Sequence, residues 1–193
     1  MRHHLLHHGL ARLVWLVGVA VLAASMAAAP ARAQSCPGDQ VVHSAAASLN
    51  QAAASGSPQA FAAVVDQHAD VSQLAKFALG PYRAALPEAR HGEYVQLTRE
   101  FLGRFIAERA ANLAGPQMQI VGCSSDSGYT YIDTRVGGNR VVWRIEDGRI
   151  IDVNVGGVWL LPQMRSNFVS VIQRGNGDPA ALLDYLRSGR SFG

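Results

Sequence analysis

The spacing of apolar residues changes twice along the chain. Between Val41 and Ala114, apolar side chains recur at the spacing of one helical face, which predicts helices. Between Gln117 and Val155 the period changes to two, which predicts strands, and from Leu160 to Arg187 the helical spacing returns. This order of helices, sheet and helices predicts an α+β domain, with the helices packed on one side of a curved antiparallel sheet.

Glycine, proline and capping residues mark where the predicted helices begin and end. Before the sheet, helices are expected at Val41–Ala54, from Ser57-Pro58 onward, from Asp70 to Leu79, and from Pro87 to Ala114. Ser57 and Asp70 are placed to cap their helices, and Gly115-Pro116 should end the longest one. After the sheet, helices are expected over Leu160–Arg174 and from Asp178-Pro179 to about Arg187.

About four strands are predicted, with tight turns between the later ones. The strands are Gln117–Cys123, Tyr129–Val136, Asn139–Glu146 and Arg149–Val155. Gly137-Gly138 and Asp147-Gly148 are two-residue connections of the kind that join neighbouring antiparallel strands. The last three strands should therefore form an antiparallel meander.

The first 33 residues have the features of a secretory leader. Met1–Arg12 carries two arginines and four histidines without an acid, and Leu13–Ala24 is apolar or small throughout. Ala31-Arg32-Ala33 offers small residues at the two positions that signal peptidase reads. We expect residues 1–33 to be a cleaved signal peptide and residues 34–193 to form a single exported domain. The alternative is an uncleaved membrane anchor that ends at Pro30.

Removal of the leader makes the chain neutral. The full sequence has 17 Lys and Arg against 14 Asp and Glu, but three arginines lie in the leader, so 17 − 3 leaves 14 bases against 14 acids. The remaining arginines are scattered rather than clustered. Nucleic-acid binding, which needs a concentrated basic surface, is therefore not expected.

Two cysteines, Cys36 and Cys123, follow the leader. An isolated pair in an oxidising compartment is more often bridged than free, so a disulfide between the first helix and the sheet is expected. Two unrelated buried thiols are the alternative. Neither cysteine lies in a pattern that indicates catalysis.

Enzyme motifs are missing from the mature sequence. It contains no G-x-S-x-G nucleophile motif and no Gly-rich phosphate loop after a strand. His43, His68 and His91 all fall on predicted helices without a second ligand at metal spacing, so each is interpreted as a surface or helix-face residue. We therefore expect no catalytic residue, metal or cofactor.

A steroid-isomerase-like site is the one enzyme hypothesis that the predicted fold allows. It would need a carboxylate in an apolar pocket with a phenol as donor, for which Asp152 with Tyr129 or Tyr131 are the candidates. Strand alternation argues against it, because Asp152 and Asn154 share a face opposite Ile151, Val153 and Val155. This pattern predicts that Asp152 is an exposed or hydrogen-bonding residue beside a turn.

Two segments resemble a known family. One runs from Phe77 to Arg83, continues through Leu86–Arg90 and covers Tyr94–Phe105; the other runs from Ile150 to Trp159 and into Gln163–Phe168. Their order and separation are similar to those of the MlaC (toluene tolerance) family of periplasmic lipid-binding proteins. The sequence differs from the family pattern at Met164 and Trp159, where the family usually has other residues, and at the tight Asp147-Gly148-Arg149 turn.

The resemblance implies an NTF2-like architecture in which the helices and the curved sheet enclose an apolar pocket. It implies a monomeric periplasmic carrier that shuttles phospholipid between the inner and outer membranes of a Gram-negative bacterium. The implied partners are an inner-membrane ABC transporter with an MCE-type ring and an outer-membrane lipoprotein complex. A hopanoid or other polycyclic lipid is an alternative ligand, and a ligand-free structural adaptor with a filled interior is an alternative function.

Candidate pocket residues come from the inner face of the long helix, the short helix before it, and the strands and helix near the second segment. Arg165 is a candidate for the pocket mouth or for a structural ion pair. The lipid-binding candidates are Phe77, Tyr82, Leu97, Phe101, Phe105, Trp143, Val153, Val155, Val158, Trp159, Met164 and Phe168.

Overall fold

The computed structural model describes residues 36–109 and 117–190. The expected leader, residues 1–33, lies outside these ranges, as does the expected helix end at residues 110–116. The helices before the sheet are α1 (Asp39–Ser55), α2 (Pro58–His68), α3 (Val71–Ala78) and α4 (His91–Ala107), with the short 3-10 helices η1 (Gly80–Ala85) and η2 (Glu88–Arg90) between α3 and α4. After the sheet come α5 (Leu160–Arg174) and α6 (Ala180–Arg187).

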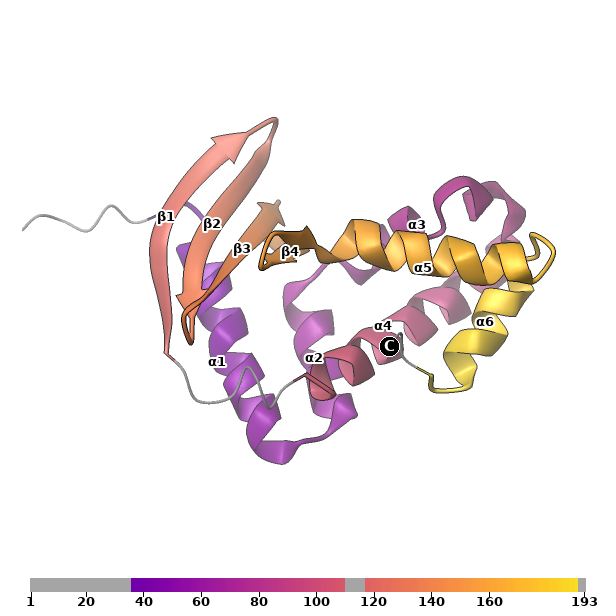
Figure 1. The fold of residues 1–193 in the computed structure, drawn as a ribbon, viewed down its shortest axis with the longest axis horizontal. Coiled ribbons are helices and arrows are strands. Elements are labelled where there is room, and N and C mark those ends of the chain that lie inside the picture. The colour runs from indigo at the N-terminus through magenta and orange to yellow at the C-terminus, as the bar shows by residue number, and fades with distance from the viewer. Residues whose placement is uncertain (1–35, 110–116, 191–193) are drawn as a thin grey trace, which may run out of the picture. The chain divides into compact units, whose positions relative to one another are not determined.

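The strands form one curved antiparallel sheet (Figure 1), which confirms the predicted α+β class. In sheet order the strands are β1 (Met118–Asp126), β2 (Tyr129–Val136), β3 (Asn139–Glu146), β4 (Arg149–Val155) and β5 (Val158–Trp159). The predicted meander is confirmed, and β2, β3 and β4 have the predicted bounds. The fifth strand, β5, was not predicted; its two residues pair with Asn154 and Val155 after a tight Gly156-Gly157 turn.

Two details of the predicted helices are wrong. The helix expected to start at Pro87 starts at His91, because the backbone of Pro87 is extended and residues Glu88–Arg90 form a 3-10 turn in which Arg90 N–H donates to the Pro87 carbonyl. Ser57 precedes α2 but does not cap it, since its hydroxyl donates to Gln59 instead. Asp70 caps α3 as predicted, accepting a 2.9 Å hydrogen bond from the backbone N–H of Gln73.

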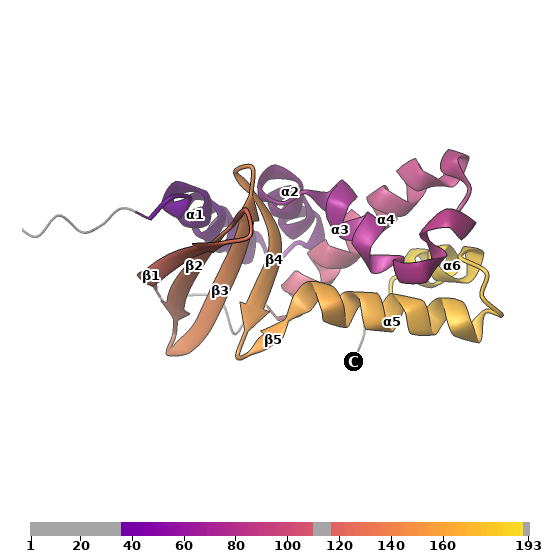
Figure 2. The ribbon, with the colours of Figure 1, turned by 90° about the horizontal axis from the view of Figure 1, so that it is seen from above.

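The helices gather around the sheet in two groups. Figure 2 shows α1 and α2 on one side of the sheet, while α5 leads away from β5 towards α6.

Between α2 and α4 the backbones approach very closely at Gly103. A Cβ atom there would lie 2.5 Å from the carbonyl oxygen of Pro58 and 2.7 Å from the Cβ of Ala62. Only glycine fits this contact, so α2 and α4 pack as one rigid pair.

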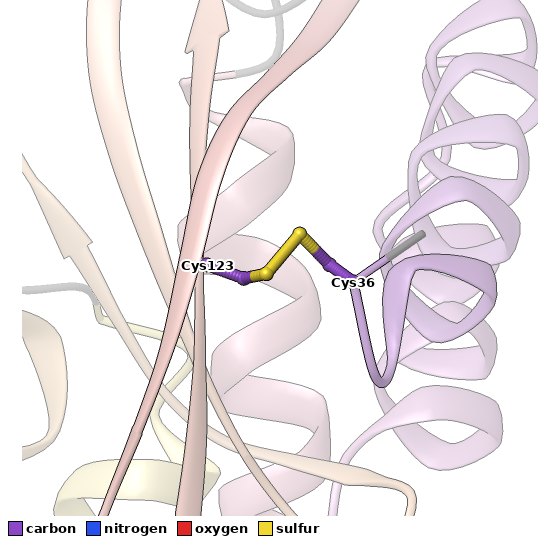
Figure 3. The surroundings of a disulfide bond; sticks show 2 residues. All are labelled: Cys36 and Cys123. Atoms are coloured by element: carbon purple, nitrogen blue, oxygen red, sulfur yellow. A yellow bond between two sulfur atoms is a disulfide. The ribbon is translucent and has the colours of Figure 1, made fainter. Parts of the chain in front are cut away.

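The N-terminal helices are tied to the sheet at two points. A disulfide joins Cys36, just before α1, to Cys123 on β1, with the Cα atoms 5.8 Å apart (Figure 3). At the other point, the Arg149 guanidinium from the start of β4 donates to the carbonyl oxygens of Asp66, Gln67 and Ala69. These carbonyls end α2, where a helix has unpaired acceptors and favours a cation. The tight turn before Arg149 thus places a cap on α2.

Candidate ligand-binding cavity

An apolar cavity of about 170 Å³ lies between the helices and the later strands. Its wall combines α1, α2 and α3, the inner face of α4, the strands β3 and β4, and the first two turns of α5. The lining residues are Ala45, Leu49, Val64, Val65, His68, Ala69, Leu74, Phe101, Leu102, Phe105, Ile106, Trp143, Ile150, Asp152, Val153, Leu160, Leu161, Gln163, Met164 and Asn167.

The part of the cavity wall formed by the sheet is apolar at Trp143, because the indole N–H of this residue is hydrogen-bonded within the sheet. Its indole N–H donates to the hydroxyl of Thr134 at 3.0 Å, and that hydroxyl donates to the carbonyl of Val141 at 2.9 Å. Thr134 is fully buried, so both bonds are shielded from water. The chain of two hydrogen bonds satisfies the indole N–H, which would otherwise be costly to bury. Trp143 therefore contributes hydrocarbon surface to the cavity.

His68 is a polar residue in this wall; of the two positions expected for it, at the surface or on a helix face, the surface position is wrong. It is buried at the end of α2, and its Nε2 lies 3.0 Å from the hydroxyl of Ser48 on α1. Burial lowers the pKa of His68, and the positive charge of nearby Arg149 lowers it further. The imidazole is therefore neutral at physiological pH, as an apolar wall requires.

Asp152 is also buried, so of the two expectations for it, an exposed or a hydrogen-bonding carboxylate, the structure shows the second. Strand alternation holds here, since Asp152 pairs with Arg144 and Val153 with Trp143, but the start of α5 covers the face on which Asp152 lies. Its Oδ1 accepts hydrogen bonds from the backbone N–H of Val153 at 2.8 Å and of Leu161, in the first turn of α5, at 2.9 Å. Burial raises the pKa of Asp152, partly offset by these hydrogen bonds and by Arg144. The carboxylate thus serves as the N-terminal cap of α5.

The tyrosines of the isomerase hypothesis do not reach the cavity. Tyr131 pairs with Arg144 across β2 and β3, whereas its neighbour Ile132 pairs with Trp143, so Tyr131 and Trp143 lie on opposite faces of the sheet. Tyr129 and Tyr131 instead pack around the guanidinium of Arg144, which also stacks on Trp159 at 4.2 Å from the ring centroid. Asp152 also pairs with Arg144 and so lies on the same face of the sheet as Tyr131, but among the described residues no tyrosine lines the cavity.

The residues predicted to bind lipid fall into two groups. Phe101, Phe105, Trp143, Val153 and Met164 line the cavity.

The other seven candidates lie elsewhere. Leu97, Tyr82 and Phe168 pack in the main core, while Trp159 stacks on Arg144. Val155 and Val158 are exposed near the β4–β5 turn. Phe77 lies in a shallow notch beneath Arg165, whose guanidinium is 5.0 Å from the ring centroid. Arg165 therefore occupies neither of the places considered for it, the cavity mouth or an ion pair.

Several lining residues escaped the sequence analysis. Ala45 and Leu49 on α1 and Val64 and Val65 on α2 form the wall opposite α5. The sequence shows that α2 has an apolar side. It does not show that this side faces strands distant in the sequence and closes a cavity against them.

Metal and membrane signals are both lacking in the ranges that the structure covers. No group of three His, Cys, Asp or Glu side chains there could hold a metal ion. No helix within residues 36–109 or 117–190 is long and apolar enough to span a bilayer.

Comparison with known proteins gives the chain its family. Its fold is similar to that of the phospholipid-binding protein from Ralstonia solanacearum, solved in complex with a phospholipid, with a TM-score of 0.64 and 18% sequence identity over 78% of this chain and 92% of that one. No curated protein matches the chain in sequence. The family model described as MlaC protein matches residues 39–188, which include every described helix and strand. The chain therefore belongs to the MlaC family.

Proposed function

We propose that this protein is a carrier that binds phospholipid tails in the apolar cavity and moves phospholipid through the bacterial periplasm. The observation that carries the proposal is the cavity itself, whose wall is almost entirely hydrocarbon. Membership of the MlaC family supports it, as does the phospholipid bound by the Ralstonia solanacearum protein of the same fold. A binding role also fits Asp152, since Oδ1 of this buried carboxylate caps α5.

The energetics explain why a carrier needs an enclosed site. Each acyl methylene removed from water gains about 0.8 kcal/mol, so a tail of about 16 carbons represents on the order of 12 kcal/mol. A cavity of about 150 Å³ lined by Leu, Ile and Phe holds one benzene molecule. The cavity of about 170 Å³ is on that scale, so it must widen as an acyl chain enters.

The proposal includes an export route and two partners. Residues 1–33 act as a signal peptide, and the mature domain is periplasmic. It exchanges lipid with an inner-membrane ABC transporter carrying an MCE-type ring and with an outer-membrane lipoprotein complex. The leader-like sequence and the family membership support this assignment.

Lipid analysis of the exported protein tests the proposal. The full chain is expressed in a Gram-negative host that makes both phospholipids and hopanoids, purified from the periplasm, and examined by native mass spectrometry and lipid extraction. We expect about one phospholipid per chain and a mature N-terminus at Gln34. Lipid-free protein would refute the carrier function, and a bound hopanoid would replace phospholipid as the ligand class.

A further inference from the structure

The wall of the cavity has one part that is held less firmly than the rest. On the helical side, Gly103 lets α4 pack directly against α2. The disulfide at Cys36 ties α1 to β1, and Arg149 ties the end of α2 to β4. These contacts leave little room for α1, α2 or α4 to move away from the sheet.

The segment from Gly156 to Met164 is the exception. It contains the β4–β5 turn, β5 and the first turn of α5, and it contributes Leu160, Leu161, Gln163 and Met164 to the cavity wall. Of the residues in this segment only Met164 is buried, whereas Phe168 and Ile172 anchor the later turns of α5 in the core. The segment can therefore swing outward while the rest of α5 stays in place.

Two attachments hold the start of α5 to the sheet: the short pairing of β5 with β4 just before the helix, and one carboxylate at its first turn. The residue before the helix, Trp159, has no capping hydrogen bond from its own side chain, and Pro162 has no N–H to donate. Asp152 on β4 supplies the cap, with its Oδ1 2.9 Å from the N–H of Leu161. Arg144 reinforces it by stacking on Trp159.

This attachment is incomplete. Asp152 Oδ2 is buried without a hydrogen bond, and its nearest cation is Nη1 of Arg144 at 3.7 Å. The Nε of Arg144 is likewise buried without a hydrogen-bond partner. Closing the segment therefore leaves two polar atoms dehydrated and unsatisfied, and opening it lets water reach both.

We propose that residues Gly156–Met164 are the gate of the cavity and that Asp152 is the latch that holds this gate closed. The inference rests on the proposed function, because it describes how a lipid tail enters and leaves. Opening the gate breaks the Leu161 hydrogen bond and the two-residue pairing of β5 with β4, and it separates the start of α5 from β4. The cavity then widens on the side where its wall is least anchored.

The latch can be tested with two matched capping carboxylates. D152A removes the cap of α5, whereas D178A removes the carboxylate that accepts from Ala180 N–H at the start of α6, away from the cavity. D152N keeps an oxygen that can accept from Leu161. Transfer of a phospholipid with a fluorescent acyl chain to phosphatidylglycerol–phosphatidylethanolamine vesicles is measured for each variant. We expect D152A to transfer lipid about tenfold faster than wild type, with D178A and D152N within about threefold of wild type.

Two results would overturn the latch. One is a D152A rate equal to wild type; the other is equal acceleration by D178A or D152N, which would point to general destabilisation or to the charge alone. Amide hydrogen exchange provides a readout that needs no lipid and remains available if D152A does not fold. In the wild-type protein, the Leu161 amide should exchange faster than those of Phe168 and Ile172, and uniform protection along α5 would contradict the gate. Absence of lipid in every variant would refute the carrier function while leaving this exchange measurement as the test of the latch.

Discussion

The close packing of α2 on α4 leads to a prediction that reverses the usual effect of a helix substitution. Replacing an exposed glycine inside a helix by alanine stabilises a protein by about 1 kcal/mol. At Gly103 the new Cβ would lie 2.5 Å from the Pro58 carbonyl oxygen, and 2.7 and 2.8 Å from the Cβ and N atoms of Ala62. Two of these three atoms are backbone, so they cannot rotate away and the helices must separate.

The expected size of the effect follows from these opposing contributions. Overpacking a filled core costs about 1–3 kcal/mol, and a clash with backbone lies at or above the upper end. After the gain in helix propensity is subtracted, G103A should destabilise the protein by about 2 kcal/mol. For a domain of this size, that loss lowers the melting temperature by about 4 to 8 °C.

Urea and thermal unfolding of the purified mature chain measure this change, and the same helix provides a control. Gly92, near the start of α4, is exposed, and a Cβ there would meet nothing within 4 Å. G92A should therefore leave stability unchanged or raise it slightly. If G103A were as stable as G92A, α2 and α4 would not be rigidly packed, and the cavity could open between these two helices.

Three further predictions concern the cavity, the disulfide and the buried histidine. V153F places a ring inside the cavity of about 170 Å³ and should strongly reduce the amount of lipid bound per chain, as measured by mass spectrometry. V155F, at an exposed position on the same strand, should leave the bound lipid unchanged. Equal loss of lipid in both variants would argue against this cavity as the binding site. The double variant C36S/C123S removes a bridge between residues 87 positions apart, so its free energy of unfolding, measured in urea, should be lower by about 4 kcal/mol. An unchanged urea midpoint would contradict a stabilising disulfide. Because the pKa of His68 is lowered on folding, the unfolded chain binds the proton more readily, so stability should fall as the pH drops below 6.5. H68Q should flatten this dependence in unfolding measured across pH, and an equally steep dependence in H68Q would assign it to another group.

Local patterns predicted the sheet well, because its turns are encoded by adjacent residues. The left-handed backbone that a two-residue hairpin requires is supplied by Gly137-Gly138 and by Asp147-Gly148. These pairs set the bounds of β2, β3 and β4 correctly. Glu88–Arg90, by contrast, forms a 3-10 turn in a sequence that equally suits an α-helix, and only the extended backbone at Pro87 separates the two.

The burial of the polar residues in the cavity wall depends on contacts distant in sequence and was not predicted for that reason. Asp152 lies on an alternating strand, and it is buried because the start of α5 covers it and donates the Leu161 N–H to its carboxylate. His68 ends a helix that reads as amphipathic, yet Ser48 on another helix covers it. The residues next to Asp152 and His68 in the sequence do not indicate these contacts with Leu161 and Ser48. Family resemblance supplied the ligand class, but it could not decide between core and cavity for Phe168.

The edges of the sheet have a consequence for self-association. At one edge, the pairing of β1 with β2 is interrupted at Val121, and the strand continues into the polar residues Ser124, Ser125 and Asp126. At the other edge, β5 is two residues long and passes directly into α5. A bulged, polar edge and a very short edge are both poor templates for strand addition. Within the part of the chain that the structure describes, neither edge of the sheet therefore offers a second copy a long flat strand to extend.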